Sequence, residues 1–339
     1  MTKTGGYFGY IVPDRLGFNN QFVSLRKKML RESQIIDLVY KVPFPGITAD
    51  TLIFIVRKGP PSLDVSARVS EYGKAPIKRP QREFLEHPSS AFEYFEDAAS
   101  QKLINKLGNM NFFRPLNLLC QSTSGYGGKS NLITEERQTK RQIPTLKGDS
   151  IGRYEQRKAY WFEFKKENIT GRTTDITKLG AKPKILMRKT GDQIIATFDD
   201  SGVYPEQSLY FLYSFQPELN PKFILGILNS RLMSFYYRAR ALTNKKSIAQ
   251  VKKVDLDILP FPPVDSSANE GRAIHDRMVR LVDQVLETKH HLTVVLTDHD
   301  KTYYQSKCDS LERQIDLLVY RLYKITDKDI EQIESPSSE

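Results

Sequence analysis

Asp149, Glu163 and Lys165 have the types and the order that could cut a phosphodiester bond. The two carboxylates could hold a metal ion, and the lysine could orient the attacking water, as in many metal-dependent nucleases. Acidic residues beside lysines are nevertheless common in a chain with 27% charged residues, and a real site has to converge in space. The spacing therefore favours an ordinary charged surface, and a nuclease is kept as an alternative.

Two further groups of residues give weaker indications of a chemical site. The run GYGGKS, residues 125–130, resembles a phosphate-binding loop, but the first glycine of that motif is replaced by Thr123. We expect a flexible glycine-rich loop there. His290, His291 and His299 cluster near the C-terminus, yet adjacent residues of a helix point about 100° apart. A solvated helix face is expected, and no metal site is predicted on this chain.

Clusters of Lys and Arg in the middle of the chain carry the strongest signal. The 339 residues have a net charge of +11. Residues 101–260 hold 27 basic and 14 acidic residues, against 24 and 26 in the rest. This confinement is typical of a module that binds a polyanion, with basic side chains on phosphates and a few polar groups reading a groove. The predicted DNA-binding residues are Arg137, Lys140, Arg141, Lys147, Arg153, Arg157, Lys158, Lys182, Lys184, Arg188, Lys189, Arg238, Arg240, Lys245 and Lys246.

Length and composition limit the classes of protein. The chain is long enough for two or three domains. It has no stretch of ~18 uncharged apolar residues and no secretory leader, so neither a membrane span nor export is expected. Its two cysteines lie far apart and suggest no disulfide framework. We expect a cytoplasmic protein.

The first 60 residues read as strand, helix, strand, strand. Residues 6–13 form an apolar run closed by a proline, which predicts a strand buried on both faces of a sheet. A helix follows, and residues 35–40 and 51–56 predict two more strands. The pattern is typical of half of a doubly wound α/β domain. Residues 6–13 should pair with one of these strands and leave one face or edge of the sheet open.

The rest of the chain divides by its patterns. Residues 61–108 look like a linker followed by a helix at 91–107, and residues 109–265 like an α+β domain with many short strands. Within that domain, residues 221–242 predict one continuous helix. Residues 266–333 predict a helical hairpin, and residues 334–339 a disordered tail.

The order of these segments resembles one family. Residues 5–59 are similar to the end of the catalytic domain of TaqI-like adenine-N6 DNA methyltransferases, where a strand ending in Val-Pro leads to a helix containing Leu-Arg and two last strands. Later segments resemble the specificity domain of the same family, which includes restriction-modification enzymes and phage-defence methyltransferases. The matching segments are 146–154, 182–212, 223–238, 258–263 and 311–326.

The resemblance also shows what these residues lack. The family's catalytic loop reads Asn/Asp-Pro-Pro-Tyr/Phe, but the Pro-Pro pairs in residues 59–62 and 261–264 lack those neighbours. Gly5, Gly6 and Gly9 follow no strand, so they do not form the family's glycine-rich cofactor turn. The resemblance implies S-adenosylmethionine for the complete enzyme and no cofactor on this chain. It also implies that Phe44 packs against a flipped adenine, with a hydrophobic plug as the equal alternative.

The resemblance implies a methyltransferase remnant with a Rossmann-like fold at 1–60, a target-recognition domain at 109–265 and the helical hairpin. Such a chain would bind double-stranded DNA and supply sequence recognition to a catalytic domain or subunit encoded upstream. Alone it should be inactive. The alternatives are a stand-alone specificity subunit, the nuclease described above, and a basic scaffold for RNA or protein.

Overall fold

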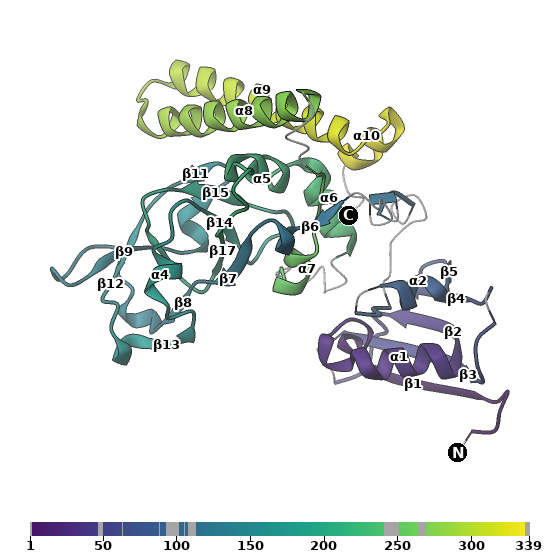
Figure 1. Cartoon of the computed structure of the whole chain (residues 1–339). Helices are drawn as coiled ribbons and strands as arrows, with labels where there is room; N and C mark the ends of the chain where they lie inside the picture. The colour runs from purple at the N-terminus through teal and green to yellow at the C-terminus, as the bar shows by residue number, and fades with distance from the viewer. Residues whose placement is uncertain are drawn as a thin grey trace. The chain divides into compact units, whose positions relative to one another are not determined.

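The computed structural model describes residues 2–46, 50–62, 64–87, 89–92, 102–104, 106–107, 113–240, 251–263 and 269–335, with side chains left aside at 20, 240, 269 and 270. The chain splits into two compact units, one formed by residues 1–105 with 239–244, the other by 106–238 with 245–339 (Figure 1). Within the described residues no helix is both long and apolar enough to span a membrane.

The first unit is a five-stranded mixed sheet in the order β1-β3-β2-β4-β5. β3 runs antiparallel to both β1 and β2, while β4 is parallel to β2 and antiparallel to β5. The elements are β1 (Tyr7–Pro13), α1 (Val23–Glu32), β2 (Ser33–Tyr40), β3 (Thr51–Lys58), β4 (Ser66–Glu71), β5 (Ile77–Pro80) and α2 (Gln81–Glu86).

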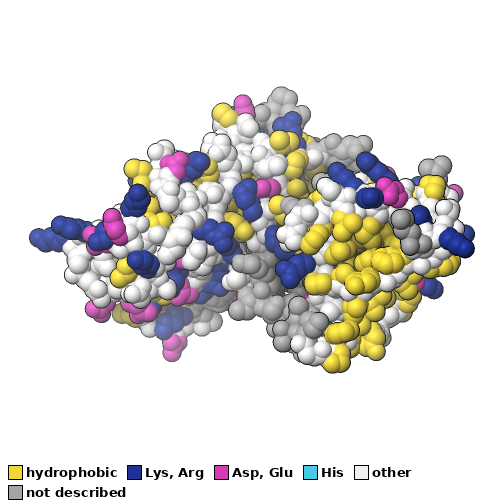
Figure 2. Space-filling view, turned by 90° about the horizontal axis from the view of Figure 1, so that it is seen from below, with side chains coloured by type: hydrophobic (Ala, Val, Ile, Leu, Met, Phe, Trp, Pro, Cys, Tyr) yellow, Lys and Arg dark blue, Asp and Glu magenta, His cyan; other side chains and the backbone are white. Residues whose placement is uncertain are grey.

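One face of this sheet holds the core. Leu30 of α1 and Phe84 of α2 pack on Leu38, Phe54 and other buried side chains. Strand alternation places Val39 of β2 with Ile53 and Ile55 of β3 on the opposite face, where they stay half-exposed. Figure 2 shows hydrophobic side chains gathered over this unit. The sheet therefore has one covered and one open face.

β1 pairs with β3, one of the two partners that the sequence allows, but it is not a buried strand. It is the edge of the sheet, and Tyr7, Phe8 and Tyr10 have exposed fractions of 65%, 47% and 61%. The apolar run predicts cover on both faces, but the strand has a partner on one edge only and its aromatic side chains are exposed. The expectation of an open edge or face is confirmed.

Residues 61–108 are not only a linker and a helix, because β4, β5 and α2 belong to the first sheet. Prolines at 60, 61, 76 and 80 hide this, since they mark the ends of short strands as well as loops. The predicted helix at 91–107 lies mostly outside the described residues.

A buried arginine ties the ends of the first unit together. The guanidinium of Arg26, in α1, donates to the carbonyls of Leu16 and Asn19 (both 2.8 Å) and of Ser89 (2.7 Å) and Ser90 (3.0 Å). Its side chain is fully buried, so these carbonyl dipoles replace water around the charge. Burial lowers the pKa of Arg26.

The second unit is α+β. Its main sheet has the order β15-β14-β17-β7, with all pairs antiparallel, and smaller sheets surround it. The strands are β6 (Arg114–Pro115), β7 (Gln121–Ser124), β8 (Tyr126–Gly128), β9 (Ile143–Leu146), β10 (Ile151–Gly152), β11 (Glu155–Gln156), β12 (Tyr160–Phe162), β13 (Ile169–Arg172), β14 (Lys184–Arg188), β15 (Ala196–Asp199), β16 (Tyr204–Pro205), β17 (Leu209–Tyr213) and β18 (Pro260–Phe261). The helices are α4 (Ile176–Leu179), α5 (Pro221–Leu228), α6 (Arg231–Arg240), α7 (Lys253–Asp257), α8 (Asn269–Val294), α9 (Asp298–Leu322) and α10 (Asp327–Glu334).

The helix predicted at 221–242 is broken in two. α5 ends at Leu228 because Asn229 turns its amide to β15, accepting from the Ala196 N–H and donating to the Ala196 carbonyl (both 2.9 Å). Ser230 then caps α6, its Oγ accepting from the Met233 N–H (3.1 Å). Neither side chain leaves a signal in the apolar periodicity, so the break was not predicted.

The helical hairpin is present as α8 and α9, followed by the short α10, and it packs on α5. A Cβ on Gly226 of α5 would lie 2.5 Å from the sulfur of Met278 in α8, so glycine permits this close approach.

Candidate nucleic-acid interface

Three predicted cations lie in the loop of residues 134–142, which precedes β9 and projects from the second unit (Figure 1). Arg137, Lys140 and Arg141 are all exposed. Figure 2 shows Lys and Arg side chains at the far-left tip of the molecule, where this loop lies. They are available to an anionic partner.

Lys147 and Lys158 lie over one aromatic ring. Their ammonium groups are 4.5 and 4.9 Å from the centroid of Tyr160, in β12. The Tyr160 hydroxyl donates to Asp149, and this hydrogen bond raises the pKa of the tyrosine. The aromatic ring thus attracts two cations, of which Lys158 is also paired with Glu135 at 2.8 Å.

Arg157 and Arg188 lie near this cluster. Arg157 is exposed and pairs with Glu155 at 2.9 Å. Arg188 is half-buried and donates to the carbonyl of Ile151. Burial lowers the pKa of Arg188, and the charge of Arg157 lowers it further. The two guanidinium groups are therefore close enough for the charge of one to act on the other.

Lys189 is buried but lacks a carboxylate within ion-pair distance among the described residues. Its ammonium donates to Ser124 Oγ and lies 4.5 Å from the ring centroid of Tyr210. Burial lowers the pKa of Lys189 to about 8, and the charge of Arg172 contributes to the shift. Arg172 was not among the predicted residues. Arg172 is exposed, follows Gly171 and has a φ of 64°. In the sequence it lies in a polar run, and nothing there indicates its place beside Lys189.

Two predicted residues face inward. Lys184 is fully buried and pairs with Asp199 at 3.0 Å, also donating to the carbonyl of Leu179. Arg153 pairs with Glu312 of α9 at 2.8 Å and so binds the helical hairpin. Burial removes Lys184 from contact with DNA and corrects the prediction for that residue, whereas Arg153 is partly exposed and its DNA contact stays a prediction.

The remaining predicted residues are partly accounted for. Lys182 and Arg238 are exposed. Arg240 ends α6, but its side chain, with Lys245 and Lys246, lies outside the described residues. Phe44 is in the first unit, with an exposed fraction of 46%. Its role in stacking on a base stays a prediction.

The alternative chemistries gain no geometric support. Asp149 accepts from Tyr160, whereas Glu163 lies 3.6 Å from Lys165 and 3.9 Å from Arg141. Among the described residues, no group of three or more His, Cys, Asp and Glu side chains could hold a metal ion. His291 stacks on Tyr304 with ring centroids 5.4 Å apart.

The glycine-rich run is not a flexible loop. Residues 126–128 form β8, which is buried and pairs with β13. A Cβ on Gly125 would lie 2.3 Å from the carbonyl oxygens of Pro205 and Glu206, so the glycine is required by close backbone approach.

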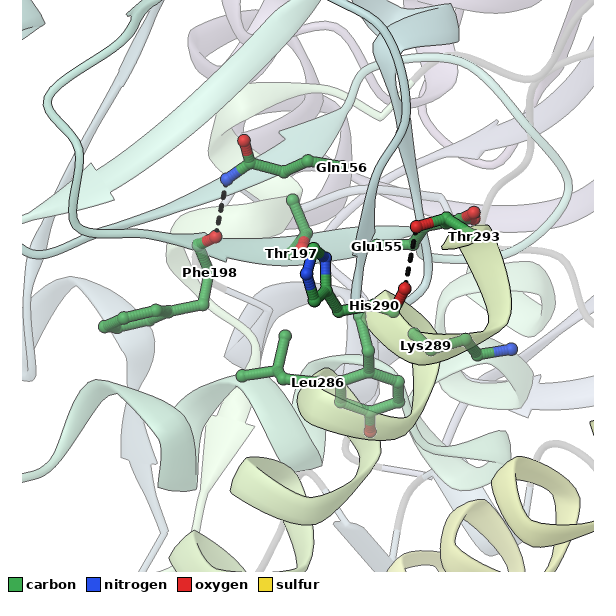
Figure 3. A pocket seen from close by; sticks show the side chains of 9 residues that line it. Glu155, Gln156, Thr197, Phe198, Leu286, Lys289, His290 and Thr293 are labelled. Carbon is green, nitrogen blue, oxygen red and sulfur yellow. Dashed lines mark hydrogen bonds between the residues drawn. The ribbon is translucent and has the colours of Figure 1, made fainter. Parts of the chain in front are cut away.

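A pocket of about 270 Å³ lies between β11, β15 and α8 (Figure 3). Its polar groups satisfy one another in part, since Gln156 donates to the carbonyl of Phe198 (2.9 Å) and Thr293 to that of His290 (2.7 Å). The predicted DNA-binding residues do not line it.

Residues 143–261 match the family described as the TaqI-like C-terminal specificity domain. The match spans β9 to β18 and contains most of the clustered cations. The chain therefore contains a TaqI-like specificity domain.

Two particular proteins resemble nearly the whole chain. RM.MjaORFECS2P of Methanocaldococcus jannaschii, named as a type II restriction enzyme and methyltransferase, is 23% identical over 344 residues, 95% of this chain and 27% of the relative. The structure of the type IIL restriction-modification enzyme MmeI in complex with DNA has a TM-score of 0.57 at 11% identity, covering 98% of this chain and 49% of that chain. At this identity the second likeness concerns the mixed α/β fold alone. The chain spans about a quarter of the curated relative and about half of the MmeI chain.

Proposed function

We propose that this chain recognises a short sequence in double-stranded DNA for an adenine-specific methyltransferase of a restriction-modification system. One observation carries the proposal: all but the last residue of the matched specificity domain, residues 143–261, lies within the segment 101–260 that holds the whole excess of positive charge. Its exposed cations would bind phosphates, and this contact would make affinity fall steeply with salt.

The residues of this chain do not fit a site for S-adenosylmethionine. Gly5 and Gly6 lead into the strand β1, and Gly9 lies within it opposite Ile55, so none of these glycines forms the turn from a strand into a helix that binds such a cofactor. The Asn/Asp-Pro-Pro-Tyr/Phe loop is also absent from the sequence. We therefore assign no step of methyl transfer to these residues and attribute catalysis to a partner domain or subunit that carries both motifs.

The first unit would be the C-terminal part of the Rossmann-like methyltransferase sheet. In support, β3 lies between β1 and β2 and runs antiparallel to both, and β1 presents exposed aromatic side chains at the sheet edge. Further strands of the catalytic domain would pair with β1, and Phe44 would pack against the flipped adenine that they bind.

Selection of tight binders from a pool of random duplexes, followed by fluorescence anisotropy, tests the recognition. We expect one enriched motif and at least tenfold weaker binding to duplexes without it. With labelled S-adenosylmethionine the chain alone should transfer no methyl group. Equal affinity for every duplex would contradict the proposal and favour a general basic scaffold, and metal-dependent cleavage by the chain would favour the nuclease.

A further inference from the structure

The loop of residues 134–142, here named the basic arm, is held in shape without an apolar core. At its base Thr134 and Trp161 exchange backbone hydrogen bonds of 3.0 and 2.8 Å. At its other end the chain enters β9, which pairs with β12. The arm is therefore anchored on both sides to the same strand.

The side chain of Gln142 closes the arm from inside. Its Oε1 accepts from the N–H groups of Gln138 (2.6 Å) and Thr139 (3.1 Å), and its Nε2 donates to Thr134 Oγ1 (3.2 Å). Thr134 Oγ1 in turn donates to the carbonyl of Glu136 (2.7 Å). Gln142 is 6% exposed, so these bonds are shielded from water.

Arg137 holds the tip. Its guanidinium lies 5.1 Å from the ring centroid of Trp161, and it donates to the carbonyls of Thr139 (3.2 Å) and Lys140 (2.8 Å). These contacts use the planar, forked geometry of arginine, which lysine lacks. Arg137 thus fixes the backbone that carries Lys140 and Arg141.

The two cations beyond Arg137 are left to solvent. The Arg141 side chain is 83% exposed and lies 3.9 Å from Glu163, and Lys140 is also exposed. Glu135, at the base of the arm, is paired with Lys158 at 2.8 Å, while Glu136 is exposed. Ordering a loop costs entropy, and here the order holds two exposed cations at a projecting tip, one of them at the outer limit of ion-pair distance from Glu163.

We propose that the basic arm is a preorganised clamp that sets Lys140 and Arg141 on the phosphate backbone of duplex DNA, with Arg137 as a positioning residue. This inference rests on the proposed function. Because the arm is ordered beforehand, the entropy of fixing it is not lost on binding. The contact is to phosphates, so it adds affinity equally to all sequences.

The test measures the affinity of the full chain for a random-sequence duplex by fluorescence anisotropy at several salt concentrations. The double variant Lys140→Gln/Arg141→Gln should bind more weakly, and its slope of log affinity against log salt should shrink by about 1.8, or about 0.9 for each phosphate contact. The matched control Lys301→Gln/Lys307→Gln removes the same charge from exposed positions of α9 and should leave the slope unchanged.

Arg137→Lys separates positioning from simple charge. It keeps the charge but loses the fork, so affinity should fall roughly 3- to 10-fold while the salt slope stays constant. Unchanged affinity in Arg137→Lys, together with a reduced slope in Arg137→Gln, would overturn the positioning role. A double variant that matches the control would overturn the clamp, whereas a wild-type chain that binds no duplex would overturn the proposed function itself. Thermal unfolding of each variant confirms that it is folded.

Discussion

β1 and β17 have nearly the same kind of sequence, YFGYIVP and LYFLY, yet they lie in opposite environments. All five residues of β17 are buried, because β14 and β7 pair with its two edges and other elements cover its faces. β1 pairs only with β3 and exposes its aromatic rings. An apolar run thus predicts a strand, while its neighbours decide whether that strand is core or contact surface.

Aromatic truncation in the two strands should separate these environments most strongly. Phe211→Ala in β17 removes a fully buried ring and should lower the free energy of unfolding by about 3–5 kcal/mol. Tyr10→Ala in β1 should change it by less than about 1 kcal/mol, because the ring is already mostly in water. Urea unfolding followed by circular dichroism measures both, and equal losses would show that β1 is covered in solution.

The buried and exposed lysines extend the comparison. Lys184→Ala should cost about 3–5 kcal/mol, because it leaves Asp199 buried without its cation. The matched change at the exposed Lys182 should cost less than about 0.5 kcal/mol. If Lys184→Ala instead reduced the salt slope of DNA binding in a fully folded protein, the assignment of Lys184 to the fold would be wrong.

A third change probes the exposed face of β1. Tyr7→Ser/Tyr10→Ser should weaken capture of a catalytic partner carrying the Asn-Pro-Pro-Tyr motif by roughly tenfold, since aromatic side chains dominate interface energies. Affinity for DNA should stay the same, because the exposed cations of the specificity domain lie in the other unit. Isothermal titration with that partner measures the loss. If both substitutions leave the affinity for the partner unchanged, the exposed face of β1 is not part of the interface with that partner.

The smallest expected effect is the titration of Lys189, whose folded pKa of about 8 lies below the usual 10.5. Between these values the unfolded chain binds more protons, so stability should rise as pH increases through this window. Around pH 8 the folded ammonium becomes neutral, so DNA affinity should fall about twofold between pH 7 and pH 9 beyond the fall in Lys189→Arg. If DNA affinity depends on pH in the same way in the wild type and in Lys189→Arg, Lys189 does not contact DNA.

Periodicity and turn residues predicted the helical hairpin, the strands β1, β2 and β3 of the first unit, and a pairing of β1 with either β2 or β3, of which β3 is the partner. They did not predict β4 and β5, whose prolines resemble linker, or the break at Asn229, which depends on a strand distant in sequence. For the candidate interface, charge pointed to the segment in which the matched specificity domain lies, but charge alone does not distinguish exposed Arg141 from buried Lys184. Gln142 and Arg172 act through neighbours that only the folded chain brings near.

Arg26 sets a minimum length for the first unit. Its guanidinium joins a helix of residues 23–32 to carbonyls at 89 and 90, which leave the ribosome more than fifty residues later. Until residues 89 and 90 have been synthesised, the Arg26 guanidinium lacks two of its four carbonyl acceptors. Completion of the unit's core therefore depends on a contact between residues distant in sequence. A gene division or an engineered fusion that ended this unit near residue 60 would therefore separate an arginine from its partners, whereas a junction after residue 92 would keep the set intact.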